Sequence, residues 1–253
     1  MAEFYSTVKA RGLAAQAHQW SSLVTCSQER LAYAKALERV APRSRVLDWG
    51  CGNGHFSYFL AEQGYHPDSY ALSDVPPLLH REKRVSFTKG ENRTSLPYPA
   101  STFDAVFALG VIEHVAEHGG SETGSLAELA RVLKPGGLLL VFHLPNRWSW
   151  IELAKWCTWR LGLTQTREHV RRFTRAGFLQ LLSGLPFEAV EAGRYHVLPR
   201  ATLGLLPGLR NAPMFCAFID AMDDALGFML AAISQNWYFV LQKRQLENVA
   251  SEE

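Results

Sequence analysis

Three alternating glycines after a short apolar run constrain the fold of this chain more than any other feature. The segment Val46–Gly54 reads VLDWGCGNG. Glycine adopts backbone conformations at positive φ and lets the backbone approach a ligand closely, so this segment predicts a first strand, a tight turn and a helix. The N-terminus of that helix would offer unpaired N–H groups and partial positive charge to a carboxylate or phosphate. The same glycines are also compatible with a purely structural turn.

The spacing of the glycines separates this turn from the dinucleotide-binding fingerprint. That fingerprint requires GxGxxG, whereas this chain has GxGxG followed by His55. A further acid, Asp74, follows the second predicted strand, where a carboxylate can accept hydrogen bonds from both ribose hydroxyls of an adenosine. The alternative for Asp74 is an N-cap before Pro76.

Beyond the turn, β-rich runs alternate with helical stretches, which is typical of a mostly parallel sheet with helices on both faces. Residues 1–40 are expected to form an N-terminal helical lid before a domain over 41–253. The stretches 145–173 and 196–235 break the alternation and are expected to be cap insertions over a binding site. The turn signal Lys134–Gly137 is expected to end a helix. The expected strands are Arg45–Trp49, Ser69–Ser73, Val85–Thr88, Phe103–Leu109, Leu138–His143, Phe187–Ala192 and Trp237–Gln242, and the expected helices are Gly54–Gln63, Glu122–Leu133 and Thr174–Ser183.

Four segments, taken in order, resemble one known family. Besides Val46–Gly54 they are Leu96–Asp104 (LPYPASTFD), Gly110–Val115 (GVIEHV) and Arg131–Gly137 (RVLKPGG). Together they are similar to the class I S-adenosylmethionine-dependent methyltransferases of type 11, the ubiquinone-biosynthesis-like group. The resemblance implies an α/β, Rossmann-like fold with a seven-stranded, mostly parallel sheet whose last strand is antiparallel. It also implies S-adenosyl-L-methionine as the cofactor and transfer of its methyl group.

The resemblance further implies which residues contact the cofactor. The adenine contact stays open between two residues, because the stretch that precedes Leu96 is longer here than in the commonest form. The implied residues are Asp48, Gly50, Cys51 and Gly52 at the methionine end, Asp74 at the ribose, Leu109 and Gly110 near the sulfonium, and Glu91 or Asn92 at the adenine.

Oxygen is the favoured methyl acceptor, and a hydroxyl acceptor must lose its proton, for which histidine is a suitable general base. His143 ends the fifth predicted strand, at the sheet edge where open α/β folds bind ligands. His169 begins a segment expected to return over the site. His114 is the third candidate, with a packing role as its alternative. No histidine has the spacing of a metal motif, which favours a metal-free mechanism. The expected acceptor contacts are Trp148, Tyr195 and His196.

The first insertion has an unusual composition. It holds four of the seven tryptophans, and residues 147–175 contain seven basic and two acidic residues. One interpretation is an amphipathic lid helix with a solvated basic face. The other is a cap that receives a large apolar, lipid-linked or anionic acceptor, or that makes peripheral contact with an anionic membrane through 147–175. The second insertion would add an apolar wall, a plain core helix or a dimer contact.

The overall composition excludes some functions and leaves others open. A net charge of +2 is too small for a general nucleic-acid binder. Four scattered cysteines, no leader-like start and the acids Asp220, Asp223 and Asp224 within the apolar stretch 212–233 predict a cytoplasmic protein without a membrane span. Three functions remain: a small-molecule methyltransferase, a nicotinamide oxidoreductase, which the glycine spacing disfavours, and a non-catalytic cofactor-binding partner. The oligomeric state is undetermined.

Overall fold

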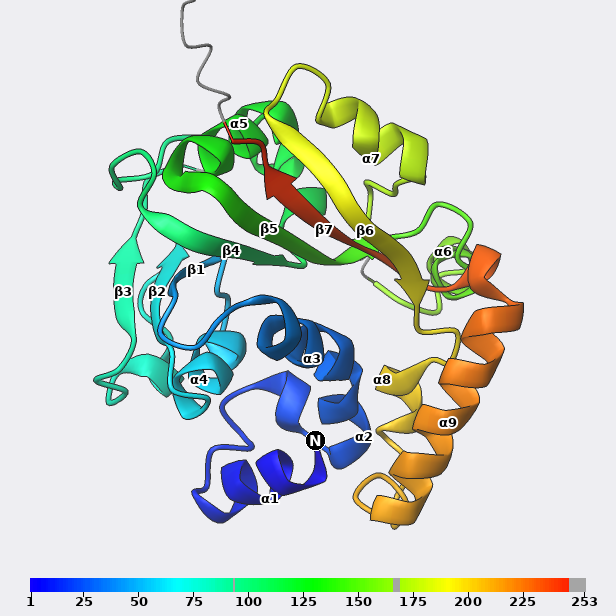
Figure 1. The fold of residues 1–253 in the computed structure, drawn as a ribbon. Coiled ribbons are helices and arrows are strands. Elements are labelled where there is room, and N and C mark those ends of the chain that lie inside the picture. The colour runs from blue at the N-terminus through cyan, green and yellow to red at the C-terminus, as the bar shows by residue number, and fades with distance from the viewer. Residues whose placement is uncertain (93, 166–168, 246–253) are drawn as a thin grey trace, which may run out of the picture.

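A seven-stranded sheet lies at the centre of the protein (Figure 1). The computed structural model describes residues 1–92, 94–165 and 169–245. The strand order is β3-β2-β1-β4-β5-β7-β6, and β7 runs antiparallel to both of its neighbours while the other pairs are parallel. The expected Rossmann-like sheet with an antiparallel last strand is therefore confirmed. The strands are β1 (Arg45–Trp49), β2 (His66–Ala71), β3 (Ser86–Lys89), β4 (Phe103–Leu109), β5 (Leu133–Pro145), β6 (Phe187–Tyr195) and β7 (Asn236–Lys243).

Helices cover both faces of the sheet, as expected. On one face α5 and α7 pack Leu126, Leu129 and Phe178 against it. On the other, α3 and α4 contribute Tyr33 and Phe56. The helices are α1 (Ala2–Ala10), α2 (Leu23–Cys26), α3 (Arg30–Arg39), α4 (His55–Glu62), α5 (Glu122–Val132), α6 (Trp150–Arg160), α7 (Arg175–Leu181), α8 (Arg200–Leu203) and α9 (Pro213–Met229).

Helix α5 ends at Val132, so the helix stops before Lys134–Gly137 as expected, but these four residues lie within β5 and not in a separate turn. Phe103 pairs with Leu133, but Ala105 already pairs with Leu138, so the intervening residues bulge out of the ladder. The bulge is held by Lys134, whose Nζ lies 2.7 Å from Asp104 Oδ1. Strand β2 begins at His66, before the expected Ser69. The first residues of β2 are polar, so a search for apolar runs does not detect them.

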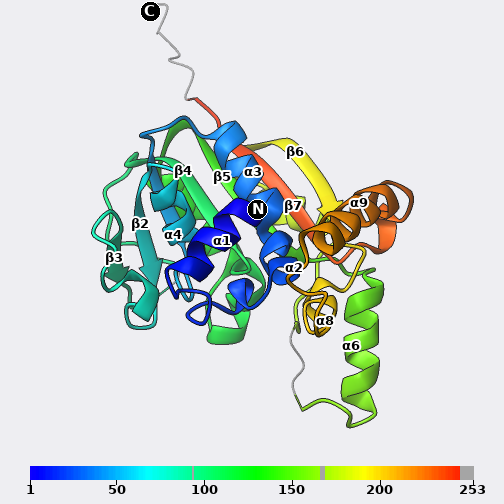
Figure 2. The same ribbon diagram turned by 90° about the horizontal axis from the view of Figure 1, so that it is seen from below.

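The two insertions and the N-terminal helices gather beyond the carboxyl edge of the sheet. The backbone N–H of Val24 donates to the carbonyl of Arg210 at 3.1 Å, which joins the N-terminal helices to the second insertion. Figure 2 shows α6 projecting away from the sheet. Across the described residues, no helix has both the length and the apolar character that crossing a bilayer requires. Three residues of the basic stretch 147–175, Thr166, Arg167 and Glu168, lie outside the described residues.

Candidate active site

The glycine turn forms one wall of a cavity of about 470 Å³, here called the glycine cavity. This volume lies in the range of small-ligand sites. Its walls come from the ends of β1 and β2 and from the segment after β4. The lining residues are Trp49, Gly50, Gly52, Tyr70, Ala71, Leu72, Ser73, Gly110, Val111 and His114.

Two of the glycines cannot be replaced without a clash. Gly50 has a φ of +79°, and a Cβ added there would lie 2.6 Å from a methyl carbon of Val111. Gly54, the N-cap of α4, has a φ of +80°, and its Cβ would lie 2.6 Å from Leu79. Gly52 also has a positive φ, but a Cβ there would find no side chain within 4 Å. The turn is therefore packed tightly from behind and open on the side of the cavity.

Asp48 is buried behind the turn and is not among the residues that line the glycine cavity. Its carboxylate accepts a hydrogen bond from the Ser57 hydroxyl at 2.5 Å, and Ser57 in turn accepts one from Ser69. Burial raises the pKa of Asp48 to about 6. Cys51 is also buried, and its backbone N–H donates to the Tyr70 carbonyl. Both residues stabilise the turn from beneath.

The residues expected at the ribose and the adenine lie outside the lining of the glycine cavity. Asp74 is 88% exposed, and its Oδ1 lies 2.7 Å from Lys89 Nζ. Leu72 and Ser73 form the cavity wall at the end of β2 instead. Glu91 and Asn92 are exposed, although the backbone carbonyl of Asn92 accepts a hydrogen bond from the Tyr70 hydroxyl.

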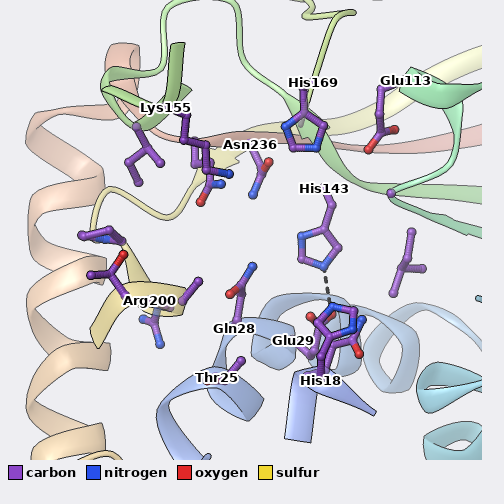
Figure 3. A pocket seen from close by; sticks show the side chains of 18 of the residues that line it. His18, Thr25, Gln28, Glu29, Glu113, His143, Lys155, His169, Arg200 and Asn236 are labelled. Atoms are coloured by element: carbon purple, nitrogen blue, oxygen red, sulfur yellow. Dashed lines mark hydrogen bonds and ion pairs between the residues drawn. The ribbon is translucent and has the colours of Figure 1, made fainter. Parts of the chain in front are cut away.

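A second cavity of about 650 Å³, here called the histidine chamber, shares Gly110 and His114 with the glycine cavity (Figure 3). Leu109 lines it as well. Its walls come from the N-terminal helices, the ends of β4 and β5, and both insertions. Five histidines (His18, His55, His114, His143 and His169) and two buried glutamates (Glu29 and Glu113) contribute to the lining.

His143 is held from both sides. Its Nε2 lies 2.8 Å from Glu29 Oε2, and its Nδ1 lies 3.1 Å from the hydroxyl of Tyr195. Burial opposes the charge on the imidazole, but the Glu29 carboxylate outweighs it and raises the pKa of His143. Burial would likewise raise the pKa of Glu29, yet the pairing with His143 holds it well below its usual value. Each member of the pair therefore favours the ionised form of the other.

His169 and His114 each contact a carboxylate through Nδ1, but the two carboxylates differ in burial. His169 Nδ1 lies 3.1 Å from Glu152 Oε2, and the Glu152 side chain is 3% exposed. His114 Nδ1 lies 2.8 Å from Glu117 Oε2, in a pair whose side chains are 34% and 26% exposed. The two rings lie 5.7 Å apart.

Glu113 is the buried acid closest to the junction of the two cavities. Its Oε1 would lie 3.6 Å from a Cβ added at Gly110. Its Oε2 has no hydrogen-bond partner among the described residues, and burial raises the pKa of the carboxyl group. One ligand atom each from Glu113, His114 and His169 lie within 4.8 Å of one another, so the fold creates a cluster of metal-ligand types that the linear spacing did not indicate.

The residues expected to contact the acceptor do not line the histidine chamber. Tyr195 stands behind His143, and burial raises its pKa well above the usual value. His196 borders a separate cavity, and burial lowers its pKa well below the usual value. Trp148 is 64% exposed beside Arg147. All three remain predictions as acceptor contacts.

Sequence reasoning missed Glu29, His55 and Glu152. Glu29 and Glu152 are charged residues at the start of helices, where acids are common, and neither belongs to a motif. His55 follows the glycine turn, and its Nε2 lies 3.6 Å from Glu29 Oε2. Only the tertiary structure brings Glu29 and His55 into the lining of the histidine chamber and places Glu152 beside His169.

Comparison with known proteins shows which family this chain belongs to. Residues 26–192 match the family described as a methyltransferase domain. The demethylmenaquinone methyltransferase of Deinococcus radiodurans is 34% identical over 196 residues, covering 74% of this chain and 71% of that protein. A ubiquinone biosynthesis O-methyltransferase of a Bradyrhizobium species is 35% identical over 114 residues, covering 44% of each chain. The chain spans about half the length of several of the curated relatives it matches.

Solved structures agree with the fold. The 1,6-didemethyltoxoflavin-N1-methyltransferase of Burkholderia thailandensis, solved with bound 1,6-didemethyltoxoflavin and S-adenosylhomocysteine, superposes with a TM-score of 0.57. The match covers 97% of this chain and 91% of that one at 18% identity. At this identity the similarity supports the fold alone.

Proposed function

Because this chain belongs to the class I S-adenosylmethionine-dependent methyltransferases, we propose that it methylates an oxygen atom of a small acceptor with a polar head group. One observation carries the proposal. The glycine cavity and the histidine chamber meet at Gly110 and His114, so a cofactor in the first and an acceptor in the second would have their reacting atoms at this junction.

The residues of the glycine cavity fit S-adenosylmethionine. The open side of the turn at Gly52 leaves room for backbone to approach the methionine end, and the N-terminus of α4 favours its carboxylate. Tyr70, Leu72 and Val111 supply apolar surface for a base. When bound, this cofactor supplies a methyl group on a positively charged sulfur.

The histidine chamber selects for a polar acceptor head group. Besides its histidines and glutamates it presents Gln28, Lys155 and Asn236, so an apolar head group would leave many polar atoms unpaired. Holding such a head group beside Gly110 turns a bimolecular reaction into an effectively unimolecular one, worth roughly 7–11 kcal/mol in well-oriented cases. Residues 1–40 act as a lid in this proposal, because His18, Thr25, Gln28 and Glu29 come from them.

Oxygen is the acceptor atom that the chamber supports best, because its histidines can assist removal of a hydroxyl proton. The name of the Bradyrhizobium relative, an O-methyltransferase, agrees with this choice. Transfer to nitrogen, as the name of the Burkholderia protein describes, or to carbon is the alternative. A non-catalytic cofactor-binding partner is the other alternative, since fold alone does not establish turnover.

Calorimetry and a turnover assay test the proposal. The protein is titrated with S-adenosylmethionine, S-adenosylhomocysteine and NAD, and release of S-adenosylhomocysteine is then followed with a fractionated cell extract. We expect binding of the first two ligands only, and label from the cofactor's methyl group in one extract component. Binding of NAD alone would contradict S-adenosylmethionine as the cofactor. Binding of S-adenosylmethionine without labelling of any extract component would favour a non-catalytic cofactor-binding partner. If fragmentation mass spectrometry places the labelled methyl group on nitrogen or carbon, that atom replaces oxygen as the acceptor.

A second, independent observation favours an acceptor with an apolar tail. Helix α6 borders the chamber through Ile151 and Lys155 and exposes Leu153 (56%) and Trp156 (38%) to the outside. Exposed Arg147 and Arg160 flank these apolar side chains. We infer that α6 rests on an anionic membrane surface, in a cytoplasmic and peripheral location, and that a lipid-linked acceptor enters the chamber from that side.

A further inference from the structure

The geometry points to His169 as the base that removes the acceptor proton and to Glu152 as the residue that positions it. This inference rests on the proposed transfer to oxygen. Both residues belong to the first insertion, so the cap would supply part of the catalytic machinery as well as a wall of the chamber.

The contact with Glu152 decides which nitrogen of His169 is available. A carboxylate only accepts hydrogen bonds, so the Nδ1 atom that lies 3.1 Å from Glu152 Oε2 must carry the proton. In neutral imidazole the lone pair is then on Nε2. Across residues 1–92, 94–165 and 169–245, no hydrogen bond to His169 Nε2 is found. Figure 3 shows the His169 ring inside the chamber, near Glu113.

Glu152 is held firmly enough to orient the ring. It lies in the first turn of α6, where its backbone N–H donates to the N-cap hydroxyl of Ser149 at 3.2 Å. Its other carboxylate oxygen lies 3.4 Å from Lys155 Nζ. Burial alone would raise the pKa of Glu152, but the contacts with His169 and Lys155 lower it. The carboxylate is therefore charged at neutral pH.

The other two histidines that the sequence offered as bases are less suited to accept a proton. Both ring nitrogens of His143 are engaged, and the raised pKa of its ring favours the protonated form, which cannot accept a further proton. His114 has the same Nδ1–carboxylate arrangement, but its pair with Glu117 is about a third exposed. Water screens such pairs, which typically contribute about 0–1 kcal/mol, whereas the Glu152 side chain is almost fully buried.

The proposed step balances without another reactant. The acceptor oxygen forms a bond to the methyl carbon while the carbon–sulfur bond breaks and its electron pair stays on sulfur. The hydroxyl proton moves to His169 Nε2, and Nδ1 keeps its proton in the hydrogen bond to Glu152. The imidazolium that results faces the carboxylates of Glu152 and Glu113, and the cationic or ionisable groups around it are Lys155, His114 and His143.

The tautomer of His169 tests the positioning role without any acceptor. Nitrogen-15 NMR of the histidine rings distinguishes the nitrogen that carries the proton, and His169→Gln identifies the signals. In the unchanged protein we expect the proton of the His169 ring on Nδ1. In Glu152→Leu we expect a shift toward the tautomer with the proton on Nε2, because leucine has a similar side-chain volume but no carboxylate to accept the hydrogen bond. Glu117→Leu is the matched control and should leave the His169 signals unchanged. An unchanged tautomer in a folded Glu152→Leu protein would overturn the positioning role.

Kinetics test the base with the acceptor fraction that the turnover assay identifies. We expect His169→Gln to lower kcat by about 10²–10⁴-fold with a KM for S-adenosylmethionine close to that of the unchanged protein. Glu152→Gln should lower kcat by a smaller factor, also without raising this KM. An unchanged kcat in His169→Gln would contradict His169 as the base but not methyl transfer. Absence of turnover in the unchanged protein would contradict the proposed function itself.

Discussion

Glu29 Oε2 lies 2.8 Å from His143 Nε2, in a buried ion pair that joins the N-terminal helices to the end of β5. The Glu29 side chain is 4% exposed and that of His143 is 17% exposed. Because each charge has lost most of its water, each depends on the other. The pair therefore couples the packing of the N-terminal helices at the end of β5 to the protonation of His143.

Glu29→Gln should destabilise the protein by about 3–5 kcal/mol, because it leaves the His143 imidazolium buried without its partner. The lowered pKa of Glu29 means that its stabilisation is present above about pH 4.3 and is lost as pH falls through its folded value. The raised pKa of His143 means that its stabilisation is complete below about pH 6.5 and is lost as pH rises through its folded value. The loss should therefore be largest between about pH 4.3 and 6.5.

Urea unfolding at pH 6 and pH 9 measures this dependence. Arg171→Gln, which breaks the exposed pair with Glu122, is the control and should change neither midpoint appreciably. An equal loss of stability at both pH values in Glu29→Gln would show that the pair does not titrate as described.

Gly50→Ala should abolish cofactor binding. The added Cβ meets Val111 at 2.6 Å, so either the turn or Val111 must move into the glycine cavity. Gly64→Ala is a matched control, because Gly64 has a φ of +83° but nothing within 4 Å of its Cβ. The control should cost about 1–3 kcal/mol of stability from backbone strain and leave the affinity for S-adenosylmethionine unchanged. Similar affinities of the two variants by calorimetry would argue against a role of the turn in binding.

Glu113→Gln should stabilise the protein at neutral pH. Burial raises the pKa of Glu113, so its ionised form destabilises the folded state increasingly as pH rises above the unfolded value of about 4.3. The neutral amide removes this effect at pH 7 and changes little at pH 4. Differential scanning calorimetry at the two pH values provides the measurement, and a lower Tm at pH 7 would contradict the expected sign.

Asp74→Ala tests the ribose contact that the family resemblance implies. The carboxylate is exposed and paired with Lys89, so binding requires it to turn toward the glycine cavity. We expect a several-fold weaker affinity for S-adenosylmethionine, measured by calorimetry. Ser73→Ala is the comparison, because Ser73 already lines the cavity. If only Ser73→Ala weakens binding, the ribose contact belongs to the end of β2 and not to Asp74.

Leu153→Glu and Trp156→Glu should reduce binding to vesicles that contain anionic lipid. Both changes place a negative charge in the exposed apolar surface of α6. Val190→Glu on β6, where Val190 is 47% exposed, is the control and should sediment with vesicles like the unchanged protein. Equal recovery of the unchanged protein with anionic vesicles and without lipid would rule out membrane contact through α6.

Local sequence patterns predicted the strand–turn–helix at Val46–Gly54 and the alternation of strands and helices along the chain. Apolar runs, glycine conformations and helix-ending residues act over a few positions, so their pattern predicts them. The bulge at Lys134–Gly137 was missed because its shape depends on Asp104 in the neighbouring strand.

The sequence alone therefore determined the fold and the position of the glycine turn, and it supplied His114, His143 and His169 as candidates. Only the tertiary structure decided which of them has a free nitrogen in the chamber. Glu29 and His143 are 114 residues apart, and Glu152 and His169 belong to an insertion without a motif. The protonation and orientation of a buried histidine depend on the carboxylate that packing places beside it, and no local pattern encodes that partner.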